Sequence, residues 1–144
     1  MPPRPVPVSR DALQRAAEGV GRATGARLIV LFGSAARPPA PESRPPEDLD
    51  LGLLSDATPD LLDLTNRFIR ALRHQAVYVT DLRRADPLLL MLVAHEGVPL
   101  YEREPGEFTC FASLAARRYA DTRKFRVSER EEVRAFVRRS ATRR

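Results

Sequence analysis

Apolar side chains change their spacing several times along the chain, and each change predicts a switch between helix and strand. Residues 10–24 place them at helical intervals, with Ser9 in position to cap the helix and Gly25 to end it. The run "RLIVLF" at 27–32 is short and apolar, as is typical of a strand that is buried on both faces. In "DLDLGLL" at 48–54 the leucines alternate with two aspartates and a glycine, so the pattern predicts a strand with one apolar and one acidic face.

The second half of the sequence continues the alternation of helices and strands. Strands that alternate with helices indicate an α/β or α+β domain. The prolines between Ala35 and Glu47 exclude regular structure and predict a stiff loop between the first two strands. The remaining expected elements are a helix from Thr58 to about residue 74, a strand at 76–82, a helix from Asp86 to about His95 and a strand at 98–101.

The C-terminal segment differs from the rest of the chain in charge. Residues 107–144 hold 11 Lys and Arg against 5 Asp and Glu, a net of +6, whereas residues 1–106 carry a net of −1. The apolar pattern of this segment predicts two helices broken near Arg126, the second capped by Ser128 with Glu131 at the capping-box position. Because aromatic side chains are few and no nucleic-acid motif is present, the basic segment favours a protein partner over RNA or DNA.

The composition is that of one globular domain. A chain of 144 residues can bury a single core, and its 43% hydrophobic and 30% charged residues are ordinary. No apolar run approaches the roughly 20 residues of a membrane-spanning helix. The first eleven residues contain four prolines and resemble neither a secretory signal nor a transit peptide, so we expect a cytoplasmic protein. The single cysteine, Cys110, excludes an internal disulfide and lies among apolar residues, so we expect it to be buried.

Two aspartates at alternate positions of the second strand carry the candidate chemistry. Asp48 and Asp50 would lie on one strand face, about 6.5 to 7 Å apart at Cα, from which both carboxylates can converge on one cation. Gly33 ends the preceding strand without a side chain, and Ser34 leads into a segment whose free amides can face an anion. Mg²⁺ prefers one or two carboxylates together with phosphate oxygens, so the combination predicts a site for a magnesium-bound nucleoside triphosphate. Either half alone also fits a turn or a solvated strand edge.

In this order, and between two strands, the motifs resemble the nucleotidyltransferase superfamily that includes DNA polymerase beta. The matching pieces are "LFGSAAR", "DLDLGLL", "VYVTDLRRADPLLL" and "HEGVPLYER", all within residues 10–103. The chain looks most like the minimal nucleotidyltransferases (MNT), small proteins often encoded beside a helical HEPN ribonuclease toxin. The resemblance implies a polymerase beta-like fold, with a small mixed sheet of about four strands, packed helices and a C-terminal helical extension.

The resemblance also implies an activity and a set of site residues. Such a chain would be an antitoxin that transfers AMP from ATP, with Mg²⁺ or Mn²⁺, to a tyrosine hydroxyl of a HEPN-type toxin held in a hetero-oligomeric complex. Gly33 and Ser34 match the motif that holds the nucleotide phosphates, and Arg37 matches a basic residue that often follows it. Asp48 and Asp50 match the metal-binding pair and are therefore the expected catalytic residues.

Two departures from the family pattern leave alternatives open. Thirteen residues, 35–47, separate Ser34 from Asp48, where ten are usual. Family members also present a third aspartate on the next strand, and Tyr78 occupies that position here. Asp81 is a weaker candidate for the metal, because strand alternation turns it to the other face.

The missing third carboxylate decides between an enzyme and a binding protein. In two-metal phosphoryl transfer the third carboxylate helps to hold the second ion, so transfer is slow or absent unless Glu47, Asp81 or a group of the partner replaces it. The first alternative is therefore a degenerate member that neutralises its partner by binding, and the second is nucleotidyl transfer to RNA. His74 and His95 lie on different elements, so we expect neither a catalytic base nor a zinc site from them. The expected division is a flexible proline-rich N-terminus at 1–8, the nucleotidyltransferase domain at 9–104 and a basic helical extension at 105–144.

Overall fold

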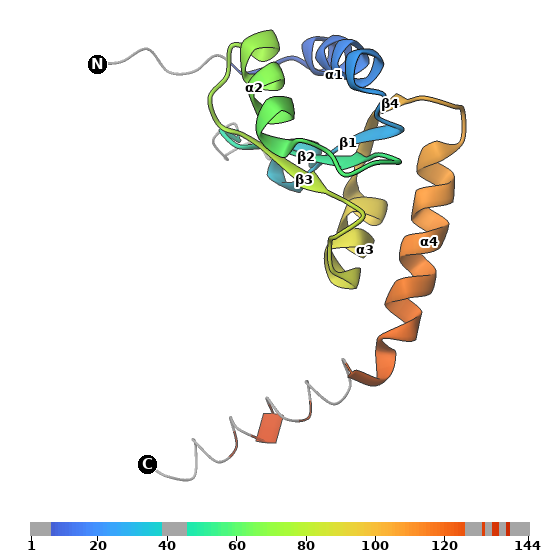
Figure 1. Ribbon diagram of the computed structural model, residues 1–144. Coiled ribbons are helices and arrows are strands. Elements are labelled where there is room, and N and C mark those ends of the chain that lie inside the picture. Colours follow the sequence, from blue (N-terminus) through green and yellow to red (C-terminus); the bar gives the residue numbers. More distant parts are fainter. Residues whose placement is uncertain (1–6, 39–45, 126–130, 132–133, 136–137, 139–144) are drawn as a thin grey trace.

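The chain forms a four-stranded mixed sheet with helices on both faces (Figure 1). The computed structural model describes residues 7–38, 46–125, 131, 134–135 and 138. The strand order across the sheet is β3-β2-β1-β4. The elements, in chain order, are α1 (Arg10–Thr24), β1 (Leu28–Phe32), the 3-10 helix η1 (Gly33–Ala36), β2 (Leu49–Leu54), α2 (Leu61–Leu72), β3 (Val77–Asp81), α3 (Pro87–Glu96), β4 (Val98–Glu102) and α4 (Glu107–Asp121).

The strand pairing confirms the expected small mixed sheet. The central strand β1 is antiparallel to both of its neighbours, β2 and β4, whereas β2 and β3 are parallel and are connected through α2. Parallel neighbours need a crossover of this kind, while antiparallel ones do not. All five residues of β1 are buried, as its uninterrupted apolar sequence predicted.

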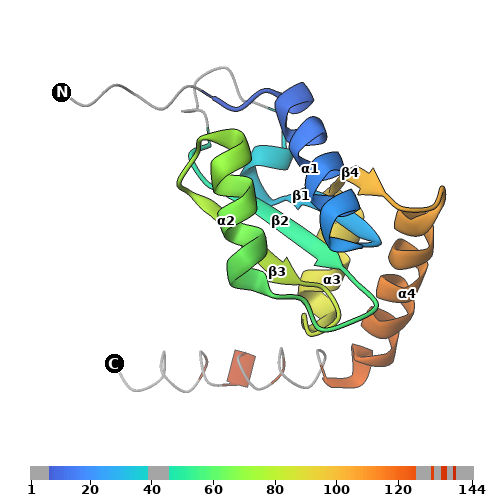
Figure 2. The same cartoon turned by 45° about the horizontal axis from the view of Figure 1, so that its top comes forward.

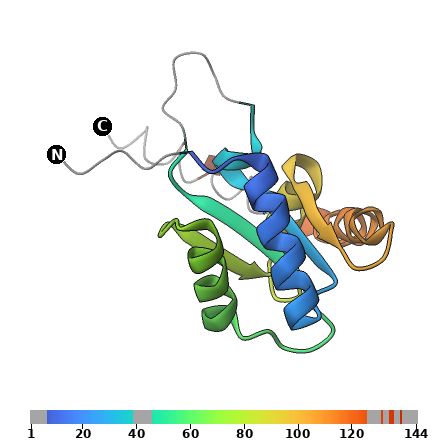
Figure 3. The same ribbon diagram turned by 90° about the horizontal axis from the view of Figure 1, so that it is seen from above.

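The helices α1 and α2 cover one face of the sheet. They lie side by side across it in the view from above (Figure 3). Ile29 and Leu31 of β1 and the three leucines of β2 at positions 49, 51 and 53 point to this layer and join its core. The alternation read from "DLDLGLL" is therefore confirmed on its apolar side. Buried side chains of the two helices complete this core: Leu13, Ala16, Ala17, Val20, Leu64 and Phe68.

The opposite face of the sheet is covered by α3 and α4, which pack closely against each other (Figures 1 and 2). Phe108, Phe111 and Ala115 form the inward stripe of α4 at helical spacing, and the rings of the two phenylalanines stack with centroids 6.3 Å apart. The prediction that Cys110 is buried was wrong. Its side chain is exposed, because it precedes Phe111 by one residue and so points about 100° away from it around the helix.

Most helix ends lie where the local signals predicted them. The hydroxyl of Ser9 accepts from the Ala12 amide, Gly25 ends α1 with φ of 70°, and Asp86 caps α3 through the Leu89 amide. The start of α2 was predicted too early, because the carboxylate of Asp60 caps that helix instead of Thr58. The helix η1 was not predicted, and its last two residues, Ala35 and Ala36, belong to the segment 35–47 that was expected to hold no regular structure. Residues 39–45 of that segment lie outside the described part of the chain.

Some expectations concern residues outside the described part of the chain. These expectations are the helix cap at Ser128, the break near Arg126 and the flexible N-terminus at 1–8, of which only residues 7 and 8 are described. In the part of the chain that the structure describes, no helix is both long enough and apolar enough to cross a membrane.

Candidate functional site

The predicted Gly-Ser and Asp-x-Asp motifs meet at one edge of the sheet. Because β1 and β2 are antiparallel, the end of β1 lies beside the start of β2, and Phe32 pairs with Asp50. Gly33 and Ser34 follow directly in η1, and Asp48 immediately precedes the first residue of β2. The strand pairing therefore brings the two motifs together, although thirteen residues separate them in the sequence.

Two features of the structure favour Gly33 at its position. Its φ of 74° lies in the left-handed region, which costs a residue with a Cβ about 1 to 2 kcal/mol. A Cβ at residue 33 would also stand only 2.6 Å from Oδ2 of Asp50. The chain turns here from β1 into η1 directly against a carboxylate, so a glycine allows the backbone and the carboxylate to approach.

Asp50 shares its sheet face with Phe32 and Tyr78. In the parallel register Asp50 pairs with Tyr78, while the flanking pairs, Leu49 with Val77 and Leu51 with Val79, point into the core under α1 and α2. Alternation then turns Phe32, Asp50 and Tyr78 to the other face, in one row across three strands. Tyr78, to which the sequence resemblance assigns the position of the family's third aspartate, is therefore the direct neighbour of Asp50.

The electrostatic environment of the aspartate pair favours a cation. Partial burial raises the pKa of Asp50, and the nearby charge of Asp48 raises it further. Asp48 is exposed at the mouth of the strand, whereas Asp50 is half buried. A carboxylate that is desolvated and close to a second one gains when a metal ion neutralises both.

Arg37 lies at the end of η1 and is held by the last residue of α3. Its Nε and one terminal nitrogen both donate to Oε2 of Glu96, each at 3.1 Å. Ser34, in the same turn, has an exposed side chain. The contact with Glu96 was not predicted, because no local pattern links residues 59 positions apart.

His74 forms a hydrogen bond with the segment that carries Asp48. Its Nε2 lies 2.5 Å from the backbone oxygen of Glu47, and since a carbonyl only accepts, Nε2 carries the proton of this hydrogen bond. The amide of Leu49 donates to the carbonyl of Ala76, which ties the same segment to the start of β3. The residues before and after Asp48 are thus fixed from the α2 to β3 connection.

Neither Asp81 nor Glu47 forms a cluster of three metal ligands with Asp48 and Asp50. Asp81 pairs with Leu53 at the far end of β3, on the face of α1 and α2, and is only 8% exposed. Its carboxylate accepts from the Arg83 amide and shapes the turn after the strand. Glu47 is exposed next to Asp48. Among the described residues, no three His, Cys, Asp or Glu side chains are grouped so that they could hold a metal ion.

The chemistry of the donors fits one divalent cation that also binds phosphate. Two carboxylates are the protein share that Mg²⁺ takes when a nucleotide supplies the remaining oxygens. Because residue 33 has no Cβ, the Asp50 carboxylate lies directly against the backbone at the start of η1. Asp48 and Asp50 would hold the ion, and Gly33 with Ser34 would face the phosphates.

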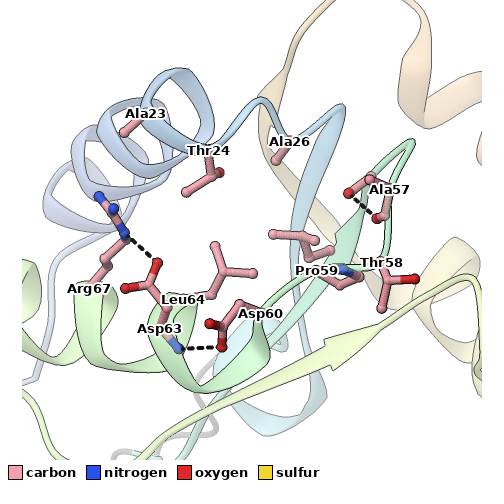
Figure 4. A pocket seen from close by; sticks show the side chains of 12 residues that line it. Ala23, Thr24, Ala26, Ala57, Thr58, Pro59, Asp60, Asp63, Leu64 and Arg67 are labelled. Carbon is pink, nitrogen blue, oxygen red and sulfur yellow. Dashed lines mark hydrogen bonds and ion pairs between the residues drawn. The ribbon is translucent and has the colours of Figure 1, made fainter.

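A separate hollow lies at the opposite end of the sheet. It has a volume of about 290 Å³ and is bordered by the end of α1, the loop after β2 and the start of α2 (Figure 4). Its polar groups are engaged with each other: Arg67 pairs with Asp63 at 2.8 Å, and the Asp63 amide donates to Asp60. None of the predicted site residues lines this hollow.

Of three comparisons with known proteins, only the comparison of structures finds similar proteins. No family model matches the sequence, and no curated protein matches it. A chain of the complex between a tri-AMPylated HEPN toxin and an MNT antitoxin of Shewanella oneidensis superposes with a TM-score of 0.69 at 22% identity, covering 87% of this chain and 98% of that one. A chain of a toxin-antitoxin complex with AMP-PNP gives 0.69 at 23% identity, with 83% and 97% covered. A chain of the MntA-HepT complex gives 0.67 at 22% identity, with 85% and 97% covered.

These similarities confirm the fold implied by the sequence motifs. The chain has the nucleotidyltransferase fold of the MNT proteins over nearly the full length of the solved chains. The resemblance was drawn from four short pieces of sequence, and it holds for the arrangement of the strands and helices between them.

Proposed function

We propose that this chain is an antitoxin of the MNT family, which binds Mg²⁺ and ATP at the edge of β1 and β2 and transfers AMP to a hydroxyl of a HEPN-type toxin. The proposal includes a cytoplasmic complex of the two proteins. It also assigns residues 9–104 to the nucleotidyltransferase domain, with the basic extension at 105–144 available to the partner.

The observation that carries this proposal is the approach of Gly33 to Asp50. A left-handed glycine lies against the half-buried carboxylate of Asp50, and the exposed carboxylate of Asp48 lies two residues before it in the chain. A structural turn needs no such carboxylate, and a solvated acidic edge needs no such glycine. Both features together suit a ligand that brings phosphate to the backbone and a cation to the carboxylates.

Each residue of the site has a role that its position allows. Asp48 and Asp50 would hold Mg²⁺, which supplies charge neutralisation at the phosphates. Gly33 and Ser34 present backbone amides and a hydroxyl towards the triphosphate. Arg37, fixed by Glu96 at the end of η1, adds a positive charge for the same phosphates.

The solved neighbours support this reaction class. One contains a HEPN toxin that carries three AMP groups, and another contains the ATP analogue AMP-PNP. A third is a mutant complex in which two aspartates, two positions apart, are replaced by glutamate, the spacing of Asp48 and Asp50 here. These facts concern those proteins, and we extend them to this chain because the fold is similar and the two aspartates have the same spacing in the sequence.

The intact mass of a partner protein tests the proposal. A HEPN-like candidate partner, sought among the products of the neighbouring genes, is incubated with the chain, ATP and Mg²⁺, and Asp50→Asn serves as the control. AMP increments that appear on the partner only with the unaltered chain would support transfer. A partner that stays unmodified under conditions where the chain binds Mg-ATP would contradict it.

One observation favours a second candidate function. Tyr78 pairs with Asp50, and the sequence resemblance assigns to it the position of the family's third aspartate, while Asp81 faces the other side of the sheet. A chain that lacks the second metal ion would neutralise its partner by forming a complex. In that case the unmodified partner would co-purify with the chain, and its toxicity would be suppressed equally well by Asp50→Asn.

A further inference from the structure

Tyr78 is the one described tyrosine that lies in the row of site residues. Its Cα is the register partner of the Asp50 Cα, and neighbouring strands are about 4.8 Å apart. The side chain is 55% exposed, and no hydrogen bond joins its hydroxyl to another described residue. Tyr78 therefore presents an exposed phenol on the edge strand, beside the carboxylate of Asp50.

Phenolic hydroxyls are acceptors of AMP in the reaction proposed above, and Tyr78 presents one from within the site. We propose that Tyr78 is an internal acceptor, so that the chain adenylylates its own Tyr78 in the presence of ATP and Mg²⁺. This inference rests on the proposed function, since it uses the same bound nucleotide. It adds a modification site, and an end product that stays attached to the chain.

The reaction is balanced without any further reactant. The phenolic oxygen of Tyr78 attacks the α-phosphorus of ATP, and a new oxygen to phosphorus bond forms. The bond from the α-phosphorus to the bridging oxygen breaks, and pyrophosphate leaves. Because Tyr78 is more than half exposed, its proton passes to water.

Geometry selects Tyr78 over the other described hydroxyls on this sheet. Thr80 points to the same face, but it pairs with Gly52, two residues or about 6.6 Å further from the motif edge. The ring of Tyr101 packs on Gly21 of α1, on the other face of the sheet. Tyr119 belongs to α4, away from the strand edge that carries Gly33 and Asp50.

Attachment of AMP at Tyr78 limits the reaction to one event per chain. The product keeps an adenylyl group beside Asp50, in the space that the next ATP would need. The reaction therefore saturates at one AMP per chain, and a modified chain has lost its capacity to bind a further nucleotide. Self-modification would therefore limit how long each chain can transfer AMP to the partner.

The experiment follows the mass of the purified full-length chain during incubation with ATP and Mg²⁺, and maps the modified residue by fragmentation. We expect a single AMP increment on the peptide that contains Tyr78. Tyr78→Phe, which keeps the exposed ring, abolishes the increment, and Tyr101→Phe leaves it unchanged. Mapping in the unaltered chain needs no variant, so a folding defect of Tyr78→Phe would not obscure the answer.

A mixing experiment tests whether the transfer is internal. Unaltered chain is combined with a mass-tagged Asp50→Asn chain, and only the unaltered chain should gain AMP, at a rate that dilution does not change. Modification of the tagged chain, or of any residue other than Tyr78, overturns the inference.

Failure of the inference differs from failure of the proposed function. A chain that adenylylates its partner or binds Mg-ATP, yet stays unmodified itself, overturns self-adenylylation alone. A chain that neither binds Mg-ATP nor modifies any protein overturns both.

Discussion

The carboxylate of Asp50 lies against the backbone of Gly33, so closely that a Cβ at residue 33 would stand 2.6 Å from Oδ2. The contact joins the end of β1 to the start of β2, where the backbone of Gly33 adopts a φ of 74°. It brings the turn after β1, the half-buried negative charge of Asp50 and the exposed Asp48 into one small region. The proposed nucleotide site depends on this contact more than on any other.

Replacement of Gly33 by alanine should weaken nucleotide binding while the fold is retained. The new Cβ meets the carboxylate of Asp50 and is strained by the left-handed φ, so we expect Mg-ATP to lose at least tenfold in affinity, or about 1.4 kcal/mol. The measurement is the shift of the thermal unfolding midpoint that saturating Mg-ATP produces.

Gly25→Ala is the matched control for this substitution. Gly25 has a φ of 70° as well, but nothing lies within 4 Å of a Cβ there. It should lower stability by about 1 to 2 kcal/mol through backbone strain alone and keep the full nucleotide-induced shift. An equal loss of the shift in both variants would contradict the role of the Gly33 contact.

Asp50→Asn should raise the stability of the ligand-free chain at pH 7. Burial and the charge of Asp48 raise the pKa of Asp50, so the folded state holds its proton more tightly than the unfolded state. Stability of the unaltered chain therefore falls as the pH rises from the ordinary value of 3.8 through the raised pKa, and the cost remains above that window.

Thermal unfolding as a function of pH checks this expectation. The difference between Asp50→Asn and the unaltered chain should be positive at pH 7 and should vanish at a pH below the ordinary value. Asp121→Asn, at an exposed site at the end of α4, should show no such difference. A destabilised Asp50→Asn variant at neutral pH would mean that a favourable contact of the carboxylate outweighs its desolvation.

Arg37→Ala should weaken Mg-ATP binding without a comparable loss of stability. The pair with Glu96 is largely exposed, and such pairs contribute about 0 to 1 kcal/mol to folding. A charged hydrogen bond to phosphate is worth about 1.5 to 3 kcal/mol, which corresponds to a loss of roughly tenfold or more in affinity. Isothermal titration with Mg-ATP measures the change. Arg84→Ala, an exposed arginine beyond the far end of β3, should bind as the unaltered chain does.

Glu107→Ala should loosen the attachment of α4 to the sheet. The carboxylate of Glu107 is 11% exposed and pairs with Arg27 at 3.0 Å, and Arg27 also pairs with Asp56. Because Arg27 is one-third exposed, solvent screens the pair, and we expect the free energy of unfolding in urea to fall by only about 1 to 2 kcal/mol. Glu104→Ala, in the exposed turn before α4, is the control and should change stability by less than about 0.5 kcal/mol. Equal effects of the two substitutions would contradict an anchoring role for the pair with Arg27.

Local signals predicted the elements of the fold well, because they depend on neighbours in the sequence. The cap at Ser9, the left-handed Gly25 and the alternation of β2 are such signals, and each is present in the structure. The exposure of Cys110 was not predicted, because the apolar residues around it suggested a core position while the inward stripe of α4 passes through Phe111.

Sequence motifs indicated the candidate site residues, but not the contacts that these residues make. Gly33, Asp48 and Asp50 could be singled out from sequence motifs. The partners of two other residues could not, since Glu96 reaches Arg37 and His74 reaches Glu47 only after distant segments have packed together. Likewise, the neighbourhood of Tyr78 and Asp50 follows from the parallel register of β2 and β3, which no local pattern specifies.

Equilibrium titration of Mg-ATP into the purified chain, in parallel with the Asp48→Asn/Asp50→Asn double variant, tests the central claim most directly. The account predicts one binding site per chain that requires the divalent ion, and no detectable binding by the double variant. Binding that persists unchanged in the double variant would contradict the assignment of Asp48 and Asp50, and with it the proposed transfer of AMP.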